Sequence, residues 1–402
     1  MKSILGVKLL NSYDKFFIFW VVICSGTLAS QRLPVLYGLV FAWLLLFSKR
    51  QVQTTNKILP YFSCFVLLWV VQLIFNGNMS DFGYLVKNAL VIFATITYFS
   101  SDIGKMQDKC VYFVELTIAF SILSNIIFVL ALVGVGLPTI PTNELGGGLS
   151  VYYLSSFSEN PFYGFNGLRN YGIYWEPGMY QVYLCFVLLF TLYTPNLFNK
   201  RRRLLMISYL LLSIITTGSV TGYALSAFII ALYLLRNNSG VFVRLLFAAA
   251  FIAGVIYMMP RFEEMLDTKQ NVGNSYAYRT LDFFEAVRIF WEKPIFGYGI
   301  VNHAYEQGTL YLFDEMRGSS NGIGNLLLNY GIIGCSVIAM LLIRCSKYLK
   351  LVFEINPLSF LVFFVISIMS EPYHQHPFFY MFLGLGLCII FNKQNNEKYS
   401  NC

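Results

Sequence analysis

Long apolar runs separated by short polar gaps fill most of the chain. A run of roughly 17–25 apolar residues is long enough to cross a bilayer as a helix. No segment shows the alternating pattern of about ten residues that is typical of barrel strands, so we predict that helices are the spanning structure. The predicted spans lie near 16–30, 33–48, 59–76, 84–100, 111–137, 172–194, 204–218, 221–235, 242–259, 322–343, 351–370 and 377–391.

The stretch 204–235 allows two interpretations, because the polar segment 216–223 divides it. It predicts either two spans joined by a tight turn or one broken pair of half-helices. With two spans there, the total is about twelve. The fold class that we predict is an all-α polytopic membrane protein with two large outer loops, 138–171 and 260–321. Residues 1–402 are expected to form a single integral membrane domain, with these two loops as the cover of its active site.

Composition excludes a soluble protein. The chain is 57% hydrophobic and 12% charged, whereas a soluble domain carries about a quarter charged residues. The first span lacks a small-residue cleavage site and is followed at once by a second, so we expect it to be an anchor and not a removed signal peptide.

Lysine and arginine gather at both termini and in alternate gaps between the spans, which predicts that these parts face the cytoplasm. The two long loops then fall together on the outer side. The net charge of +8 comes mostly from this cytoplasmic collar, so no nucleic-acid partner is implied. The residues of the collar are Lys2, Lys8, Lys15, Lys49, Arg50, Lys57, Lys105, Lys109, Lys200, Arg201, Arg202, Arg203, Arg236, Arg344, Lys347, Lys350, Lys393 and Lys398.

Motifs for metals and cofactors are missing from the sequence. The eight cysteines are scattered, none of them lies in either outer loop, and no CxxC pair or His/Cys cluster occurs. There is also no phosphate-binding P-loop and no GxSxG nucleophile motif. We therefore predict neither a metal site nor a cofactor.

The first outer loop is rich in Gly, Pro, Ser, Asn and Tyr, which suits either contact with sugars or an aromatic belt at the membrane interface. Glu176 follows it in the run Tyr-Trp-Glu-Pro-Gly. Beside Pro177 it is either an acidic residue that complements a helix dipole or a carboxylate that faces a cavity, where it orients a hydroxyl or pairs with Arg169.

The second outer loop contains a predicted helix from Tyr276 to Trp291, with an apolar stripe on one side. Arg279 has one local partner, while Arg288 can pair with glutamates at i−3 and i+4. Pro294 is expected to stop the helix. Two glycines then permit a tight turn in the sequence Pro-Ile-Phe-Gly-Tyr-Gly at 294–299.

These residues resemble the O-antigen polymerase and ligase superfamily of bacterial inner-membrane proteins. The resemblance rests on Arg279 followed by a helix, on PIFGYG at 294–299, and on SSNGIGNLLLNYGIIG at 319–334. Arg169 followed by Trp-Glu-Pro-Gly at 175–178 looks like the polymerase branch. The predicted spans and outer loops match over the whole chain.

The chain also departs from the family. Many members, ligases in particular, place a histidine where this chain has Ser320 and Asn321, and an arginine where it has Val220. Both departures favour a polymerase over a ligase. His303 lies in the appropriate loop and could replace the absent histidine as a base, unless it is only a solvated surface residue.

The resemblance implies a glycosyltransferase that joins lipid-linked oligosaccharides on the periplasmic side, with both termini cytoplasmic. Its substrate would be an undecaprenyl-pyrophosphate-linked oligosaccharide, and its other partners membrane lipids and a chain-length regulator protein. Catalytic roles fall to Arg279, Glu176 and His303. Substrate binding falls to Arg169, Arg288, Ser320 and Asn321.

Two alternatives stay open from the sequence. A ligase that transfers the polysaccharide to the lipid A–core shares the fold and differs in the acceptor. A lipid-linked sugar flippase predicts ionisable residues deep in several spans and two similar halves. Here only Lys87 and Glu115 have intramembrane positions, and no internal repeat is visible.

Overall fold

The computed structural model describes residues 10–32, 34–46, 52–76, 81–101, 105–138, 140–141, 148–151, 155–159, 168–194, 198–236, 275–312 and 318–391. The predicted span at 242–259 and the start of the second outer loop lie outside the described residues.

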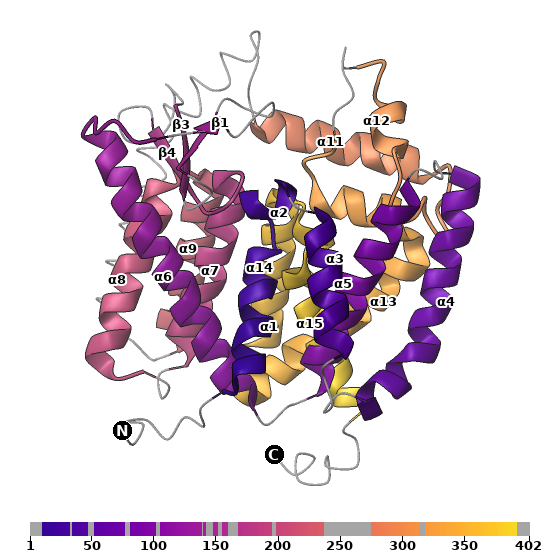
Figure 1. Ribbon diagram of the computed structural model, residues 1–402, viewed down its shortest axis with the longest axis horizontal. Helices are drawn as coiled ribbons and strands as arrows, with labels where there is room; N and C mark the ends of the chain where they lie inside the picture. The colour runs from indigo at the N-terminus through magenta and orange to yellow at the C-terminus, as the bar shows by residue number, and fades with distance from the viewer. Residues whose placement is uncertain are drawn as a thin grey trace.

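The helices stand side by side as a bundle (Figure 1). In chain order they are α1 Ser12–Ile23, α2 Leu28–Arg32, α3 Pro34–Leu46, α4 Val52–Asn76, α5 Phe82–Ser101, α6 Met106–Leu132, α7 Pro177–Tyr193, α8 Lys200–Thr216, α9 Val220–Arg236, α11 Ser275–Phe290, α12 Ala304–Gly308, α13 Gly322–Phe353, α14 Pro357–Ser370 and α15 Pro377–Phe391.

Four helices of the described chain, α4, α5, α6 and α13, are long and apolar enough to cross a membrane. Shorter apolar helices accompany them, among them α7, α9, α14 and α15. Large apolar side chains such as Leu67 and Phe75 are exposed on α4, as expected of a surface that contacts lipid. The total of twelve crossings stays a prediction.

The predicted boundaries hold in most places and fail in two. The stretch 204–235 forms two helices, α8 and α9, with Gly218 at φ 60° in the turn between them. The first predicted span is broken into α1 and α2 near Gly26. The gap expected at 344–350 is wrong, because α13 continues through it for 32 residues in all. Its Lys, Arg and Leu residues are strong helix formers, so the helix extends past the end of its apolar run.

A small antiparallel sheet in the first outer loop was not predicted. Its strands are β1 Ile140–Pro141, β2 Gly148–Val151, β3 Ser155–Glu159 and β4 Leu168–Gly172, hydrogen-bonded in that order. The strands are short and rich in Ser and Gly, which hides them from pattern analysis. Val151 and Phe157 pack on Ile127 and Phe128 of α6, so the sheet rests on the end of that helix.

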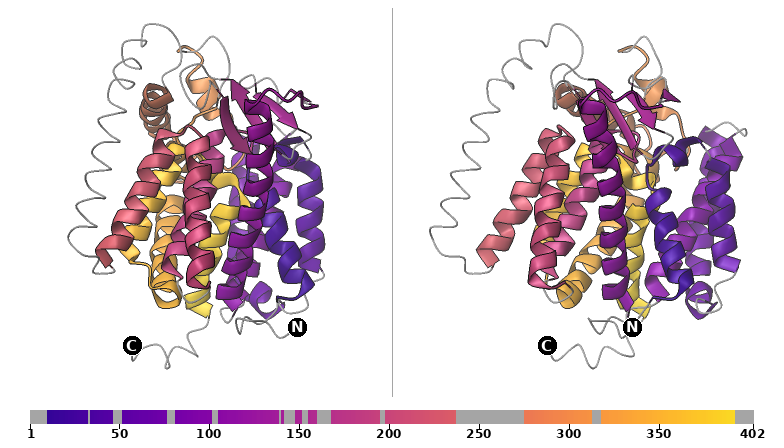
Figure 2. Two further views of the ribbon diagram at one scale, coloured as in Figure 1. Left: turned by 90° about the vertical axis from the view of Figure 1, so that its left-hand side faces the viewer. Right: turned by 60° about the vertical axis from the view of Figure 1, so that its left-hand side comes forward.

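The sheet, α11 and α12 lie at one end of the bundle, which we call the outer end. Figures 1 and 2 show that α1 begins and α15 ends at the opposite end. The described parts of the two long loops therefore lie on the same side, as the charge pattern predicts. Which membrane face this side meets stays a prediction.

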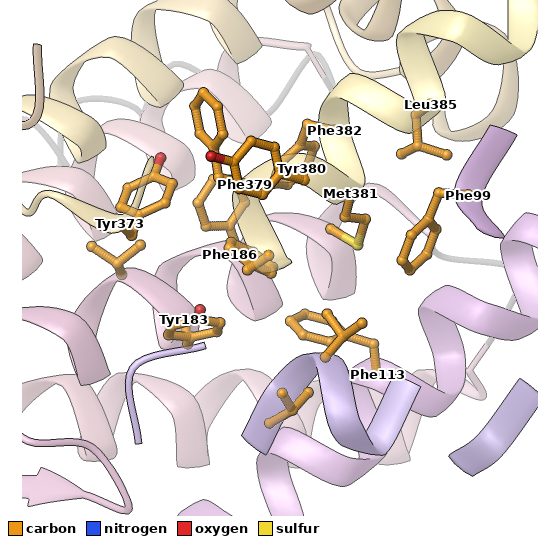
Figure 3. Close-up of a cluster of buried hydrophobic side chains, with 14 of the residues drawn as sticks. Phe99, Phe113, Tyr183, Phe186, Tyr373, Phe379, Tyr380, Met381, Phe382 and Leu385 are labelled. Carbon is orange, nitrogen blue, oxygen red and sulfur yellow. The ribbon is translucent and has the colours of Figure 1, made fainter. Parts of the chain in front are cut away.

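Helix α7 lies inside the bundle, and all of its residues are buried. Figure 3 shows its Tyr183 and Phe186 gathered with aromatic side chains of α6 and α15. The ring of Phe186 lies 4.9 Å from that of Phe378 and 5.1 Å from that of Phe382. Close packing of this kind holds membrane helices together where the hydrophobic effect is weak. It also fixes the start of α7, where Glu176 lies.

The turn at 294–299 docks into a break in α13. Gly331 interrupts that helix with φ 59° and ψ −171°, and a Cβ on Gly331 would lie 2.4 Å from the carbonyl oxygen of Ile295. A Cβ on Gly297, where φ is 70°, would lie 2.4 Å from the carbonyl oxygen of Leu328. Only glycine permits both the conformation and the approach. Four backbone hydrogen bonds close the junction: Tyr298 N–H to Leu328 O, Gly299 N–H to Asn329 O, Ile332 N–H to Pro294 O, and Ile333 N–H to Ile295 O.

Candidate active site

Arg279 and Glu371 form an ion pair at the outer end of the bundle. Nη2 of Arg279, on α11, donates to Oε1 of Glu371 at 2.5 Å. Glu371 is the residue that ends α14, and its side chain is 3% exposed, whereas the Arg279 side chain is 25% exposed. The carboxylate therefore lies in the protein interior, and the guanidinium partly faces solvent. Nε of Arg279 is buried without a hydrogen-bond partner.

Glu176 lies beside this pair, at the N-terminus of α7. Its backbone is extended, with φ −148° and ψ 155°, and its side chain makes no capping hydrogen bond. Oε1 of Glu176 is shielded from solvent and has no hydrogen-bond partner. The dipole interpretation from the sequence therefore lacks the capping contact that would support it, although a charge at this position would still face the dipole.

Glu176 and Glu371 influence each other directly. Burial, followed by the charge of Glu371 and a hydrogen bond with it, raises the pKa of Glu176 well above the usual range, while Arg279 and Arg169 act in the opposite direction. Two neighbouring carboxylates repel each other when both are ionised. Burial and the charge of Glu371 therefore favour the protonated form of Glu176, and Arg279 is the ion-pair partner of Glu371.

Gly178 makes room for this arrangement. A Cβ on Gly178 would lie 1.8 Å from Oε1 of Glu371, so the Glu371 carboxylate packs directly against the first turn of α7. The Pro177–Gly178 pair thus has two roles: proline begins the helix, and glycine admits the second carboxylate.

Arg169 reaches the same region from β4. Its Nε donates to the carbonyl oxygen of Thr217, in the turn between α8 and α9, at 3.0 Å. The neighbouring Asn170 fixes the strand, because its side chain bonds to Asn125 at 2.7 Å and to Ser124 at 2.8 Å, both on α6. Arg169 is thus held in place by a buried polar network. Two guanidinium groups and two carboxyl groups thus come together at this end of the bundle. We call them the carboxyl–arginine cluster, which consists of Arg169, Glu176, Arg279 and Glu371.

Arg288 and His303 make ion pairs of their own, outside the carboxyl–arginine cluster. Arg288 pairs with Glu285 at 2.8 Å and donates to the carbonyl oxygen of Gly308 at 2.6 Å, which is the surface pairing that its sequence neighbours suggest. His303 pairs with Asp81 and with Glu306. The Glu306 hydrogen bond is the main cause that raises the pKa of His303. Catalytic or substrate roles for these two residues stay predictions.

Ser320 and Asn321 connect α11 to the start of α13. The backbone N–H and the hydroxyl of Ser320 both donate to Asp282, at 2.7 and 2.6 Å. The Asn321 side chain caps α13 by accepting from the N–H of Gly324 at 3.0 Å. The Ser320 contacts, together with a hydrogen bond from Nδ2 of Asn321 to the carbonyl oxygen of Arg279 at 3.4 Å, hold α11, which carries Arg279. Substrate contact by either side chain stays a prediction.

Glu371 is not among the site residues predicted from the sequence. It follows the predicted span 351–370 directly, in the run Glu-Pro-Tyr-His-Gln-His-Pro, so it sits at the outer end of a span just as Glu176 does. The same criterion that singled out Glu176 applies to it. Among the described residues, no group of three His, Cys, Asp or Glu is placed to hold a metal ion.

Comparison with known proteins gives one family match. A family model described as O-antigen ligase matches residues 204–339, from α8 into α13. The matched region contains Arg279, Ser320, Asn321 and both glycines of the junction between the 294–299 turn and α13. No curated protein and no solved structure matches the chain.

Proposed function

Because the family match supports the O-antigen polymerase and ligase superfamily, we propose that this protein polymerises undecaprenyl-pyrophosphate-linked oligosaccharide repeat units on the periplasmic side of the bacterial inner membrane. The donor is a growing glycan on undecaprenyl pyrophosphate. The acceptor is a sugar hydroxyl of a second lipid-linked unit.

The observation that carries this proposal is the convergence of Arg169 and Arg279 beside a buried carboxyl pair. A departing pyrophosphate needs cations, and arginine binds phosphate oxygens through two parallel hydrogen bonds. Arg279 is partly exposed and keeps an unused buried Nε–H. It therefore has both the access and the donor capacity for a phosphate ligand. Arg169 supplies a second positive charge from a different element.

In the proposed reaction, the acceptor oxygen forms a bond to the anomeric carbon of the donor. The bond between that carbon and the pyrophosphate oxygen breaks, and its electron pair leaves with undecaprenyl pyrophosphate. The two arginines stabilise the negative charge that develops on this leaving group. The proton of the acceptor hydroxyl passes to the carboxyl pair.

Arg279 links the two halves of this chemistry. In the free protein its guanidinium compensates Glu371. When the guanidinium turns to a phosphate, the carboxyl pair loses the positive charge that opposes its protonation. The pair can then take up the proton of the acceptor. In this scheme the arrival of the donor prepares the base.

A polymerase is favoured over a ligase by two positions. Ser320 stands where many ligases have a histidine, and its hydroxyl is bonded to Asp282. Val220 stands where many members carry an arginine, next to the turn whose Thr217 carbonyl binds Arg169. We infer that Arg169 brings to this turn the positive charge that Val220 cannot.

The experiment is an assay of purified protein in nanodiscs with an undecaprenyl-pyrophosphate-linked repeat unit from the host. We expect a ladder of longer lipid-linked glycans and stoichiometric release of undecaprenyl pyrophosphate, both lost in Arg279→Ala. A deletion strain separates the alternatives. A single repeat unit on the lipid core indicates a polymerase, and long chains left on the carrier indicate a ligase. Units stranded on the cytoplasmic face indicate a flippase. Either of the last two results would overturn the proposal.

A further inference from the structure

A polar cavity of about 590 Å³ lies at the outer end, next to α5. We call it the α5 cavity. Its walls come from α5, from the segment 300–306 and from the loop before α15, and its polar lining includes Asp81, Lys87, Asn88, Glu306 and Gln375. A smaller cavity of about 250 Å³ shares Asn302, Glu306 and Gln375 with it. Ligand sites in proteins have volumes of roughly 300–1,000 Å³ and a few convergent polar groups, and the α5 cavity meets both criteria.

The charges that line the α5 cavity nearly balance. Asp81 and Glu306 flank His303, at 3.4 and 2.9 Å from its ring nitrogens. Lys87 lies over the ring of Tyr84, with its Nζ 5.0 Å from the ring centroid. Burial, with a further contribution from Lys87, lowers the pKa of His376 to about 4, so this ring is neutral at pH 7. The cavity thus offers two carboxylates, one ammonium group, amides and imidazoles.

This lining differs in kind from the carboxyl–arginine cluster. A pyrophosphate in the α5 cavity would face two carboxylates beside Lys87 and His303, whereas the carboxyl–arginine cluster offers two guanidinium groups, which bind phosphate oxygens better. A sugar hydroxyl both donates and accepts hydrogen bonds. Carboxylate oxygens can accept from such hydroxyls, the Lys87 ammonium can donate to them, and the amides of Asn88 and Gln375 can do either.

The α5 cavity adjoins the start of α7. His376 lines the cavity, and a Cβ on Gly26 would lie 3.3 Å from Nε2 of His376 and 2.8 Å from Cε of Met179. The carbonyl oxygen of Gly26 in turn accepts from the N–H of Trp175 at 3.4 Å. One short segment around Gly26 therefore separates the cavity from Glu176 and its neighbours. The cavity and the start of α7 are therefore neighbours on either side of this segment.

We propose that the α5 cavity binds the non-reducing end of the acceptor oligosaccharide as an uncharged polyhydroxylated ligand, with Lys87, Asn88 and Glu306 as the residues that select it. This inference rests on the proposed function, because it divides the two substrates between two sites. The pyrophosphate of the donor lies at Arg169 and Arg279. The acceptor sugar lies in the cavity, and the unit that carries the reacting hydroxyl must pass the Gly26 segment to reach Glu176 and Glu371.

The test measures binding and activity separately. The first probe is the host repeat-unit oligosaccharide, released from its carrier and freed of phosphate. The second is farnesyl pyrophosphate, a soluble polyprenyl pyrophosphate. Both are titrated into purified protein in nanodiscs. We expect Lys87→Met and Asn88→Ala each to weaken oligosaccharide binding at least tenfold and to leave farnesyl pyrophosphate binding unchanged. Arg279→Ala should do the reverse. Methionine keeps the apolar stem of Lys87, which packs near Gly38 of α3.

Lys293→Met is the matched control. Lys293 is also an outer-end lysine, with its Nζ 4.8 Å from the ring centroid of Tyr298, but it does not line the cavity. It should change neither binding constant. Oligosaccharide binding that is unchanged in Lys87→Met and Asn88→Ala, or equally weakened in Lys293→Met, would overturn the inference. Polymer formation by the wild type in those same preparations would leave the proposed function intact. A wild type that binds the oligosaccharide through the cavity but forms no polymer would overturn the proposed function alone.

Discussion

Nη2 of Arg279 lies 2.5 Å from Oε1 of Glu371, although 92 residues separate them in the chain. The contact joins a helix of the second outer loop to the end of a helix in the bundle. Removing one partner of a buried ion pair leaves an uncompensated charge, which costs about 3–5 kcal/mol of stability when both partners are fully buried. The cost is smaller here, because Arg279 is partly exposed. A ligand that replaces Glu371 as the partner of Arg279 must therefore be an anion.

Replacing Arg279 should abolish polymer formation. Removal of one group that stabilises developing negative charge costs about 100-fold or more in rate, and we expect Arg279→Ala to reach this range. Arg279→Lys should rescue poorly, because an ammonium cannot form two parallel hydrogen bonds. Arg288→Ala is the control, since its ion pair is exposed and contributes little. Polymer length and rate are measured at matched protein levels. Normal polymer from Arg279→Ala would exclude its role at the pyrophosphate.

The Glu176→Gln substitution separates the two interpretations of that residue. If Glu176 only complements the helix dipole, glutamine should cost about 0.3–1 kcal/mol of stability and no activity. If Glu176 must exchange a proton with Glu371 during turnover, Glu176→Gln should remove most polymerisation at unchanged abundance, because an amide cannot carry out that exchange. Asp should also be impaired, because it is one methylene shorter. We expect the second pattern in the nanodisc assay. A glutamine variant that forms polymer at the normal rate would remove Glu176 from the mechanism.

Thermal stability should depend on pH through Glu176. Its pKa in the folded protein is raised by burial and by Glu371, above the value of about 4.3 in an unfolded chain. Because the folded protein binds the Glu176 proton more tightly than the unfolded chain does, this proton adds to the free energy of unfolding. The contribution is fully present below about pH 4.3 and is lost as pH rises through the raised pKa. Glutamine does not titrate. The unfolding temperature of the wild type should therefore fall relative to that of Glu176→Gln as pH increases from about 4.5. Parallel curves in the two proteins would show that Glu176 titrates normally.

Gly178→Ala should displace Glu371. The added methyl group would lie 1.8 Å from Oε1 of that residue, so the carboxylate must move and Arg279 loses its position. Misplacement of a catalytic group by about 1 Å can cost roughly 100-fold in rate. Gly83→Ala, in α5, is the matched control, because a Cβ there meets nothing within 4 Å. It should be stabilising by up to about 1 kcal/mol. Equal activity of the two variants would contradict the packing of Glu371 on α7.

Gly297→Ala and Gly331→Ala should both destabilise the protein. Each position has positive φ, and each Cβ would lie 2.4 Å from a backbone oxygen. Gly134→Ala provides the comparison, since Gly134 also has positive φ, at 77°, but a Cβ there meets nothing within 4 Å. The free energy of unfolding of Gly134→Ala should therefore fall only by the cost of left-handed backbone for a residue with a Cβ, about 1–2 kcal/mol. The larger fall in unfolding temperature at Gly297 and Gly331 then measures the junction itself. Similar losses at all three positions would contradict the close approach.

Orientation can be tested with single cysteines in a background that lacks the native ones. Leu310, in the outer-end segment, and Leu351, near the far end of α13, are both exposed. Leu310→Cys should react with a membrane-impermeant maleimide in intact spheroplasts. Leu351→Cys should react only after permeabilisation, because the positive collar predicts a cytoplasmic position. The reverse pattern would invert the topology and remove the periplasmic reaction with it.

Hydropathy and turn chemistry predicted much of the fold, because they act locally. The apolar runs predicted most helices, and the two glycines predicted the tight turn in which Gly297 and Gly299 have positive φ. Contacts between distant segments were not accessible in this way. The break at Gly331 is set by the docked turn and not by its own neighbours, which read as continuous helix. The partnership of Glu371 with Arg279 depends on the packing of α7, α11 and α14, and no single stretch encodes it.

The junction between the 294–299 turn and α13 divides the second outer loop into a part before it, which contains α11, and a part after it. The chain between Gly299 and Leu328 begins and ends at the same set of backbone hydrogen bonds, so it forms a closed loop. Insertions or substitutions within that loop alter the wall of the α5 cavity at Asn302, His303 and Glu306. Arg279 lies before the junction, but Ser320 and Asn321, inside the closed loop, hold its helix α11. If the cavity selects the acceptor as proposed, changes at Asn302, His303 and Glu306 that spare Ser320 and Asn321 should alter the choice of sugar while Arg279 keeps its position.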